Sequence, residues 1–221
     1  MAAFVIVLIT SNIIGPAKIS QIDMPVIGTI TFGAGVIFFP LSFIFGDILT
    51  EVYGYSASRR VIWVGFIGLG FASLMAWTIV ALPPAPYWDN QKVYEVAFGS
   101  VWRVALAGMV AFAAGEFVNS YVMAKMKIWT KGKRLWTRTI GSTIFGEGVD
   151  SIIFYPLAFY NSGVIPNDKL LLVVLAQFLA KTLVEIIFTP VTYAVIKFLK
   201  THEKIDFYDD KTNFNPFTLK E

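Results

Sequence analysis

The chain has 221 residues, of which 56% are hydrophobic, 16% aromatic and only 15% charged, and its formal net charge is +3. A soluble domain of average composition carries about 25% charged residues. With so few charged side chains, and with a mean hydropathy of +0.66, this chain could not cover a water-soluble globule with polar surface. We therefore expect an all-α polytopic membrane protein.

Residue types that commonly build metal sites and nucleophiles are scarce. The chain has no cysteine, which excludes disulfides, thiolate metal sites and cysteine nucleophiles. Its single histidine, His202, lies in the polar C-terminal tail. We therefore predict neither a cofactor nor a metal site, and serine–histidine catalysis is not expected. The N-terminus lacks a basic region and a small-residue cleavage site, so we expect no signal peptide.

Apolar segments follow one another along the chain, each close to the roughly 20 residues that span the hydrocarbon of a bilayer. They run about Ala2–Ala17, Met24–Ile48, Arg60–Leu82, Ser100–Met123, Thr139–Asn161 and Leu170–Leu199. We predict one transmembrane domain of six helices over residues 1–200. Residues 201–221 form a polar cytoplasmic tail without helical periodicity, which we expect to be mobile.

The placement of basic residues predicts the orientation in the membrane. Thirteen lysines and arginines lie in the loops after the second and fourth segments and at the C-terminal end: Arg59, Arg60, Lys125, Lys127, Lys131, Lys133, Arg134, Arg138, Lys197, Lys200, Lys204, Lys211 and Lys220. The other connections hold only Lys18, Lys92, Arg103 and Lys169. The positive-inside rule then places both termini in the cytoplasm. A nucleic-acid patch would be the alternative reading of the basic loop, but topology explains it better, and we expect no nucleic-acid partner.

The chain also resembles itself. The matched pairs, in the same order, are Asn12–Lys18 with Asn119–Lys125, Phe32–Val36 with Phe145–Val149, and Ile37–Phe43 with Ile153–Phe159. Apolar sequence produces chance similarity, yet three ordered matches favour a 3+3 inverted repeat. In transporters with such repeats, the substrate binds near the midplane where the halves meet.

Carboxylates recur at mid-membrane depth, where each ionised one costs at least a few kcal/mol and is a functional-site hypothesis by default. Glu147 and Asp150 share one helix face because they are three residues apart. Lys181 reaches the same depth, and it can pair across helices with either carboxylate or along its own helix with Glu185. Glu116, Asn119 and Gln177 add further polar groups to these spans.

Acceptors outnumber donors in this group, which suits a ligand rich in N–H donors, a cation or a transported proton. A carboxylate can accept two parallel hydrogen bonds from a guanine-like edge. The ring of Phe145 could stack on a flat heterocycle, as could Phe38, Phe39, Phe154 and Tyr155, although aromatic residues in a span more often face lipid or pack.

Charged residues also gather at the end of the second segment. Asp47 and Glu51 are followed, one short turn later, by Arg59 and Arg60. This pattern predicts an ion-paired corner that holds a helix end and its turn, and such a corner could act as a cytoplasmic gate.

Three stretches resemble the signatures of one family: Asp47–Arg60 with Ile62-Trp63, Ser142–Ser151, and Gln177-x3-Lys181. The chain resembles, over essentially its whole length, the queuosine precursor transporters, also called the vitamin uptake transporter family. The resemblance implies a bacterial or archaeal inner-membrane importer of 7-cyano-7-deazaguanine or its aminomethyl relative (preQ0 and preQ1). It also implies a homodimer and a fold similar to the substrate-binding subunits of energy-coupling-factor transporters.

The resemblance carries site roles over to matching positions. Substrate-binding residues would be Glu147, Asp150, Gln177, Lys181, Glu116, Asn119 and Asn12, and the substrate path would also include Asp47, Glu51, Arg59 and Arg60. The stacking argument adds Phe145 to the substrate-binding residues, and the charge pattern predicts that the last four form the gate or ion-paired corner. A binding subunit of an ATP-driven uptake system is the alternative, and because the chain has no Walker motif its ATPase would be a separate chain. An intramembrane enzyme is disfavoured because the spans lack histidine and cysteine.

Overall fold

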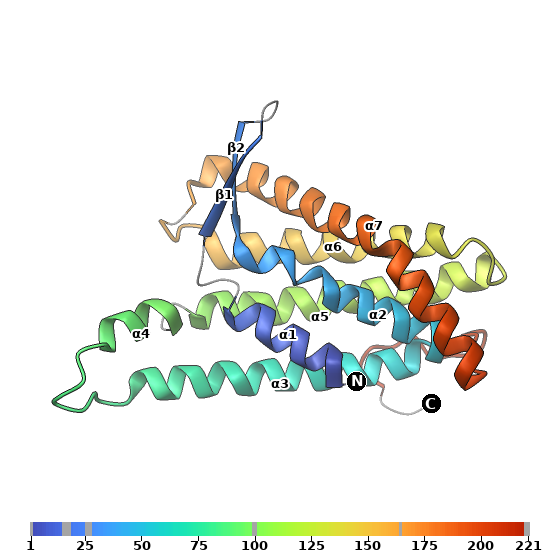
Figure 1. Cartoon of the computed structure of the whole chain (residues 1–221), viewed down its shortest axis with the longest axis horizontal. Helices are drawn as coiled ribbons and strands as arrows, with labels where there is room; N and C mark the ends of the chain where they lie inside the picture. Colours follow the sequence, from blue (N-terminus) through green and yellow to red (C-terminus); the bar gives the residue numbers. More distant parts are fainter. Residues whose placement is uncertain (1, 15–18, 25–27, 99–100, 164, 219–221) are drawn as a thin grey trace.

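A computed structural model describes residues 2–14, 19–24, 28–98, 101–163 and 165–218. These residues form seven α-helices, two short 3-10 helices and one β-hairpin (Figure 1). The elements are α1 (Ala2–Ile14), β1 (Ile19–Met24), β2 (Gly28–Gly33), η1 (Ala34–Ile37), α2 (Pro40–Tyr53), α3 (Tyr55–Ala81), α4 (Gln91–Phe98), α5 (Val101–Trp129), α6 (Leu135–Phe159), η2 (Asn167–Lys169) and α7 (Leu170–Glu203). The predicted helical class is confirmed.

The predicted count of six membrane-crossing helices is only partly matched. Among the described residues, three stretches are long and apolar enough to cross a membrane: Tyr55–Ala81, Leu106–Trp129 and Asn167–Glu203. Helix α6 has 25 residues but carries the two central carboxylates. Helices α1 and α2 have 13 and 14 residues, fewer than the roughly 20 of a full crossing. Six crossings therefore stay a prediction.

The predicted second span, Met24–Ile48, is not a single helix. Its first part pairs with β1 in an antiparallel hairpin, and η1 and α2 follow. Gly28 and Gly33 bound a run rich in threonine and isoleucine, which favour strands. Pro40 then opens α2 in its first turn, where its missing N–H removes no helical hydrogen bond.

The predicted repeat is not confirmed by local structure. Phe32–Val36 covers the end of β2 and most of η1, whereas its match Phe145–Val149 lies inside the continuous helix α6. The last residues of the first match, 15–18, lie outside the described residues.

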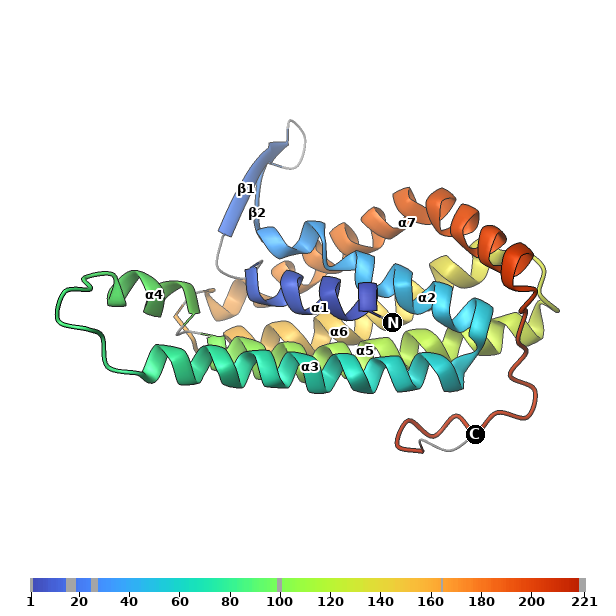
Figure 2. The ribbon, with the colours of Figure 1, turned by 60° about the horizontal axis from the view of Figure 1, so that its bottom comes forward.

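The helices run back and forth along the long axis of the molecule (Figures 1 and 2). The α2–α3 and α5–α6 turns and the end of α7 gather at one end, and the hairpin, α4 and the α6–α7 connection at the other. We call the first of these the basic end, because Arg59 and Arg60 lie near the start of α3 and residues 131–134 lie in the α5–α6 turn. This grouping agrees with the predicted distribution of basic loops.

The interior has an apolar side and a polar side. Phe4 and Leu8 of α1 pack with Val61 and Ile62 of α3 and with Phe112 of α5. Polar side chains lie instead between α2, α5, α6 and α7. This second region holds the residues that the sequence singled out.

Helices α5 and α6 cross in near backbone contact, because glycines face each other. A Cβ on Gly115 would lie 2.8 Å from the carbonyl oxygen of Gly146, and one on Gly146 would lie 2.6 Å from the Cβ of Asn119. Small residues allow such close helix packing in membranes. The crossing places the polar residues of both helices on one seam.

The tail after α7 folds back onto the bundle, and we call residues 204–218 the C-terminal strap (Figure 2). Both carboxylate oxygens of the buried Asp209 accept hydrogen bonds from the backbone N–H of Tyr55, each at 3.1 Å. Arg59 donates to the carbonyl oxygens of residues 213 and 215, and Trp63 Nε1 donates to that of Pro216 at 2.7 Å. The prediction of a mobile tail is therefore wrong for these residues. Each of these hydrogen bonds joins a side chain to a backbone group, so the docking of the strap leaves no recognisable pattern in the sequence.

Candidate functional site

Two groups of polar side chains, most of them buried, join the helices. The central cluster consists of Asp47, Glu116, Asn119, Ser142, Glu147, Asp150, Gln177, Lys181 and Glu185. The Glu51 cluster, at the basic end, consists of Glu51, Lys127, Arg138, Lys200 and Asp206.

Four helices contribute to the central cluster: α2, α5, α6 and α7. The members on α5, α6 and α7 include residues three or four positions apart, which share a helix face, such as Glu147 with Asp150 and Lys181 with Glu185, whereas α2 contributes Asp47 alone. Every member is buried. The sequence predicted this face on α6 and α7, and the fold brings both together.

Lys181 pairs across helices rather than along its own. Its ammonium group donates to Asp150 and lies 3.1 Å from Oε2 of Glu147. The ring of Phe39 lies below the same ammonium group, with 4.3 Å between Nζ and the ring centroid. The predicted pairing of Lys181 with the α6 carboxylates is confirmed, and Glu185 is left without this cation.

Asp47 belongs to the central cluster, not to the predicted corner. Its Oδ1 accepts from Asn119 Nδ2 at 2.8 Å and from Ser142 Oγ at 3.2 Å. Asp47 and Glu51 do share a helix face, but that face points into the bundle, towards α5 and α6. The predicted pairing of Asp47 with Arg59 or Arg60 is therefore wrong.

The central cluster contains more acceptors than its own donors satisfy. Within the described part of the chain, buried oxygens without a hydrogen-bond donor occur on Asp47, Glu116, Asn119, Glu147, Gln177 and Glu185. Five carboxylates stand against the single ammonium group of Lys181. Buried polar atoms normally find partners, so this surplus suits a ligand that brings N–H donors or positive charge.

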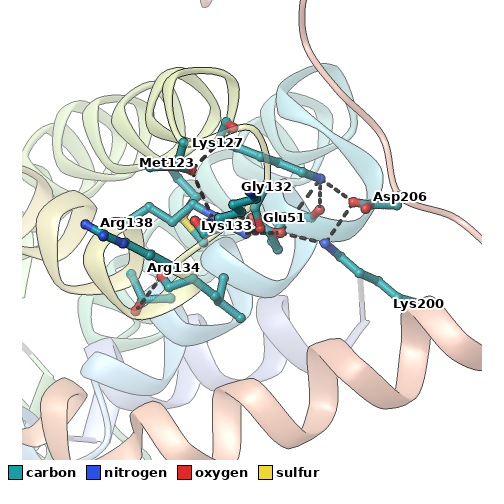
Figure 3. A network of polar contacts seen from close by, with 12 residues as sticks. Glu51, Met123, Lys127, Gly132, Lys133, Arg134, Arg138, Lys200 and Asp206 are labelled. Atoms are coloured by element: carbon teal, nitrogen blue, oxygen red, sulfur yellow. Dashed lines mark hydrogen bonds and ion pairs between the residues drawn. The ribbon is translucent and has the colours of Figure 1, made fainter.

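The Glu51 cluster is an ion-pair network in which Glu51, Lys127 and Arg138 are buried, Lys200 is partly buried and Asp206 is exposed (Figure 3). Arg138 Nε and Nη2 donate to the two carboxylate oxygens of Glu51, each at 2.7 Å. Lys200 donates to the same carboxylate at 2.6 Å, and Lys127 Nζ lies 3.8 Å from it. Asp206 then bridges the two lysines at 2.6 and 2.8 Å.

Asp206 is the member of this network that lies outside the helices. Burial by itself raises the pKa of its carboxyl group, but the ammonium groups of Lys127 and Lys200 outweigh that effect and hold the pKa below its ordinary value. The carboxylate is therefore charged at neutral pH and ties the start of the C-terminal strap to α5 and α7.

The prediction that Glu51 forms ion pairs is thus confirmed, but the predicted partners are wrong. Arg138, Lys127 and Lys200 take the place of Arg59 and Arg60. Arg59 binds the strap, and Arg60 is exposed. Sequence reasoning counted the three true partners only as topology signals, since nothing in their spacing distinguishes them from the neighbouring basic residues.

Two predicted substrate contacts lie elsewhere. Phe145 is 58% exposed, so its ring is not among the buried groups of the central cluster, and its stacking on a ligand stays a prediction. Phe39, at Lys181, is an aromatic ring that does face the cluster. Asn12 donates to the carbonyl oxygen of Leu8 at 2.9 Å and lies beside Gly108 of α5.

A hollow of about 470 Å³ opens at the basic end between α2, α6 and α7. Its lining includes Glu51, Arg138, Tyr193 and Lys200. Glu51 is one helical turn from Asp47, roughly 6 Å along the axis of α2. The hollow therefore ends close to the central cluster, with the Glu51 cluster between them.

Comparison with known proteins agrees with a transport role. A family described as "Putative vitamin uptake transporter" matches residues 33–195. The "Probable queuosine precursor transporter" of Bacillus subtilis (strain 168) is 31% identical over 171 residues, covering 77% of this chain and 72% of that protein. The "Queuosine precursor transporter" of Escherichia coli (strain K12) is 25% identical over 163 residues, covering 73% and 71%. No solved structure matches the chain.

The family match covers most of the chain, and it includes every residue of the central cluster. The relatives are named transporters, not enzymes. With three helices that are long and apolar enough to cross a membrane, the chain is a multi-pass membrane protein, and it belongs to the vitamin uptake transporter family.

Proposed function

We propose that the chain imports queuosine precursors across the inner membrane and binds the flat base, 7-cyano-7-deazaguanine or its aminomethyl relative, in the central cluster. The names of the relatives supply the substrate class. The observation that carries the proposal is the set of buried, unpartnered acceptors around the Lys181–Asp150 pair.

The chemistry of such a base fits these acceptors. One edge of a deazaguanine carries adjacent ring and exocyclic N–H groups, which can donate two parallel hydrogen bonds to one carboxylate. Its ring carbonyl can accept from the amide of Asn119 or Gln177 or from Lys181. The substrate-binding residues are therefore Glu116, Asn119, Glu147, Asp150, Gln177 and Lys181, whereas a contact with Asn12 stays a prediction.

The Glu51 cluster forms the cytoplasmic gate of this transporter. It lies at the basic end, which faces the cytoplasm by the positive-inside rule. The hollow beside it is the vestibule from which the base leaves. Both termini are cytoplasmic in this arrangement, and the protein works as a homodimer with six crossings per subunit.

Uptake of labelled base into proteoliposomes tests the proposal. The protein alone should transport the base; no flux without added subunits would refute a self-sufficient importer. Asp150→Asn and Lys181→Ala should each abolish uptake while the protein still inserts, because each removes half of the buried pair. Matched controls are Asp168→Asn and Lys169→Ala, whose exposed side chains lie before α7.

Wild-type rates in both central variants would refute the site. Restoration of queuosine by supplied base, in a strain that lacks both synthesis and its own importer, tests the substrate in cells.

A further inference from the structure

Two carboxylates of the central cluster have no partner at all among the described residues. Glu116, on α5, is 0% exposed, and Glu185, on α7, is 4% exposed. All four of their oxygens lack a hydrogen-bond donor. The hydroxyl of Thr143 lies near Glu185, but it donates to the carbonyl oxygen of Thr139 at 2.7 Å.

Glu116 occupies a niche that the sequence of α2 leaves open for it. A Cβ on Gly46 would lie 1.6 Å from Oε1 of Glu116. The carboxyl group therefore fills the space of a missing side chain, directly beside Asp47. In this position the carboxyl group of Glu116 is already shielded from water by α2.

The charged surroundings of the pair are mostly negative. The carboxylates of Asp47 on α2 and Glu147 on α6 interact electrostatically with both Glu116 and Glu185, Asp150 of α6 also interacts with Glu116, and Glu116 interacts with Glu185. Within the described cluster the one cation, Lys181, is engaged by Asp150 and Glu147.

An ionised carboxylate in this position is costly. Burial of an unpaired ion costs several kcal/mol, and like charges nearby add to that cost. A protonated carboxyl group avoids both effects. If all five carboxylates of the cluster were ionised, they would exceed the charge of Lys181 by four.

We propose that the Glu116–Glu185 pair holds a proton in the substrate-free state and releases it when the base binds, so that the proton and the base compete for this pair. The proposal rests on the function proposed above. The O–H bond of one glutamic acid breaks, the proton leaves to solvent, and N–H donors of the base take its place on the carboxylate. Donors that bind the charged form of a carboxyl group favour that form.

This linkage predicts a direction with pH. Acid protonates the pair and competes with the base, so apparent affinity falls as pH falls. The fall reaches about tenfold per pH unit when one proton is released per base.

Isothermal titration calorimetry on the purified full chain measures the number of protons released. 7-Cyano-7-deazaguanine is the ligand, because it lacks the titratable aminomethyl group of its relative. It is titrated into the protein in buffers of different ionisation enthalpy. We expect about one proton released per base bound. Glu116→Gln or Glu185→Gln should remove that release, while Glu95→Gln, on the exposed surface of α4, should keep it.

The outcomes separate the two proposals. Binding with equal heats in every buffer, or unchanged release in both glutamine variants, would overturn the proton proposal and leave the transport function intact. No binding by the wild type would overturn the proposed substrate itself. Infrared spectroscopy then tests the pair without ligand: a carbonyl band of protonated carboxylic acid should disappear in the glutamine variants, and its absence from the wild type would end the proposal.

Discussion

Replacing Glu51 by glutamine removes the carboxylate on which three cationic side chains converge, while it keeps nearly the same volume. Arg138 keeps at most one of its two bonds to residue 51, now to a neutral amide oxygen, and keeps Thr130 and the carbonyl oxygens of residues 132 and 133. The amide NH₂ of glutamine would also face an N–H donor. Lys127 and Lys200 retain Asp206, so the loss falls mainly on Arg138.

Removal of one partner from a buried ion pair costs about 3–5 kcal/mol, and the surviving Asp206 contacts place this case near the lower value. A loss of about 3 kcal/mol multiplies the unfolding constant by more than a hundredfold. Denaturant unfolding in detergent measures it, with Glu95→Gln on the exposed face of α4 as the matched control. The control should stay within about 0.5 kcal/mol of wild type, as surface substitutions usually do.

The double variant Glu51→Gln/Arg138→Met shows whether the single variant is destabilised by the unpaired guanidinium or by a general failure to fold. Because it removes the stranded guanidinium as well, it should recover much of the stability. A single variant as stable as wild type, or a double variant no better than the single one, would refute the idea that this network holds the basic end together.

Three further predictions concern the helix crossing and the strap. Gly146→Ala should destabilise the protein by about 1–3 kcal/mol, because the added methyl group overpacks against α5. The control Gly148→Ala, whose Cβ would meet nothing closer than 3.8 Å, should leave stability unchanged. Thermal unfolding of the two variants measures the difference. Asp209→Ala should cost about 1 kcal/mol by uncapping α3 and speed proteolysis of the strap, unlike the exposed Asp210→Ala; unchanged cleavage would contradict its docking. Because the pKa of Asp206 is lowered in the folded state, its stabilisation is present above about pH 4 and is lost as pH falls through the folded pKa; hydrogen exchange of the strap should rise there, and Asp206→Asn should abolish that pH dependence.

The sequence predicted that Lys181, Glu147 and Asp150 lie at one depth, but it left open whether Lys181 pairs with these carboxylates or with Glu185 of its own helix. Helical spacing fixes which residues share a face, and the distance from each helix end fixes the depth, so two helices of known direction bring equal depths together. The same reasoning could not find the partners of Glu51. Charges one turn away in sequence look close, but the turn at Gly54 sends α3 back along α2, and Arg59 points to the strap.

The hairpin shows a different limit. The stretch Met24–Ile48 satisfies a length criterion for a membrane span, because such a criterion averages hydropathy and ignores how glycine and proline interrupt a helix. The strap escaped prediction for a related reason. Its hydrogen bonds join side chains such as Asp209 and Trp63 to backbone groups of distant segments, and backbone groups look the same at every position.

The Glu51 network also sets an order of events during biogenesis. Glu51 precedes Arg138 by 87 residues and Lys200 by 149. When α2 is made, the cations that surround Glu51 do not yet exist: Lys127 comes with α5 and Arg138 with α6. Lys200 follows only at the end of α7, and Asp206 only after it. A chain that stops before these two residues contains most of the bundle but lacks the contacts that tie the strap to the basic end.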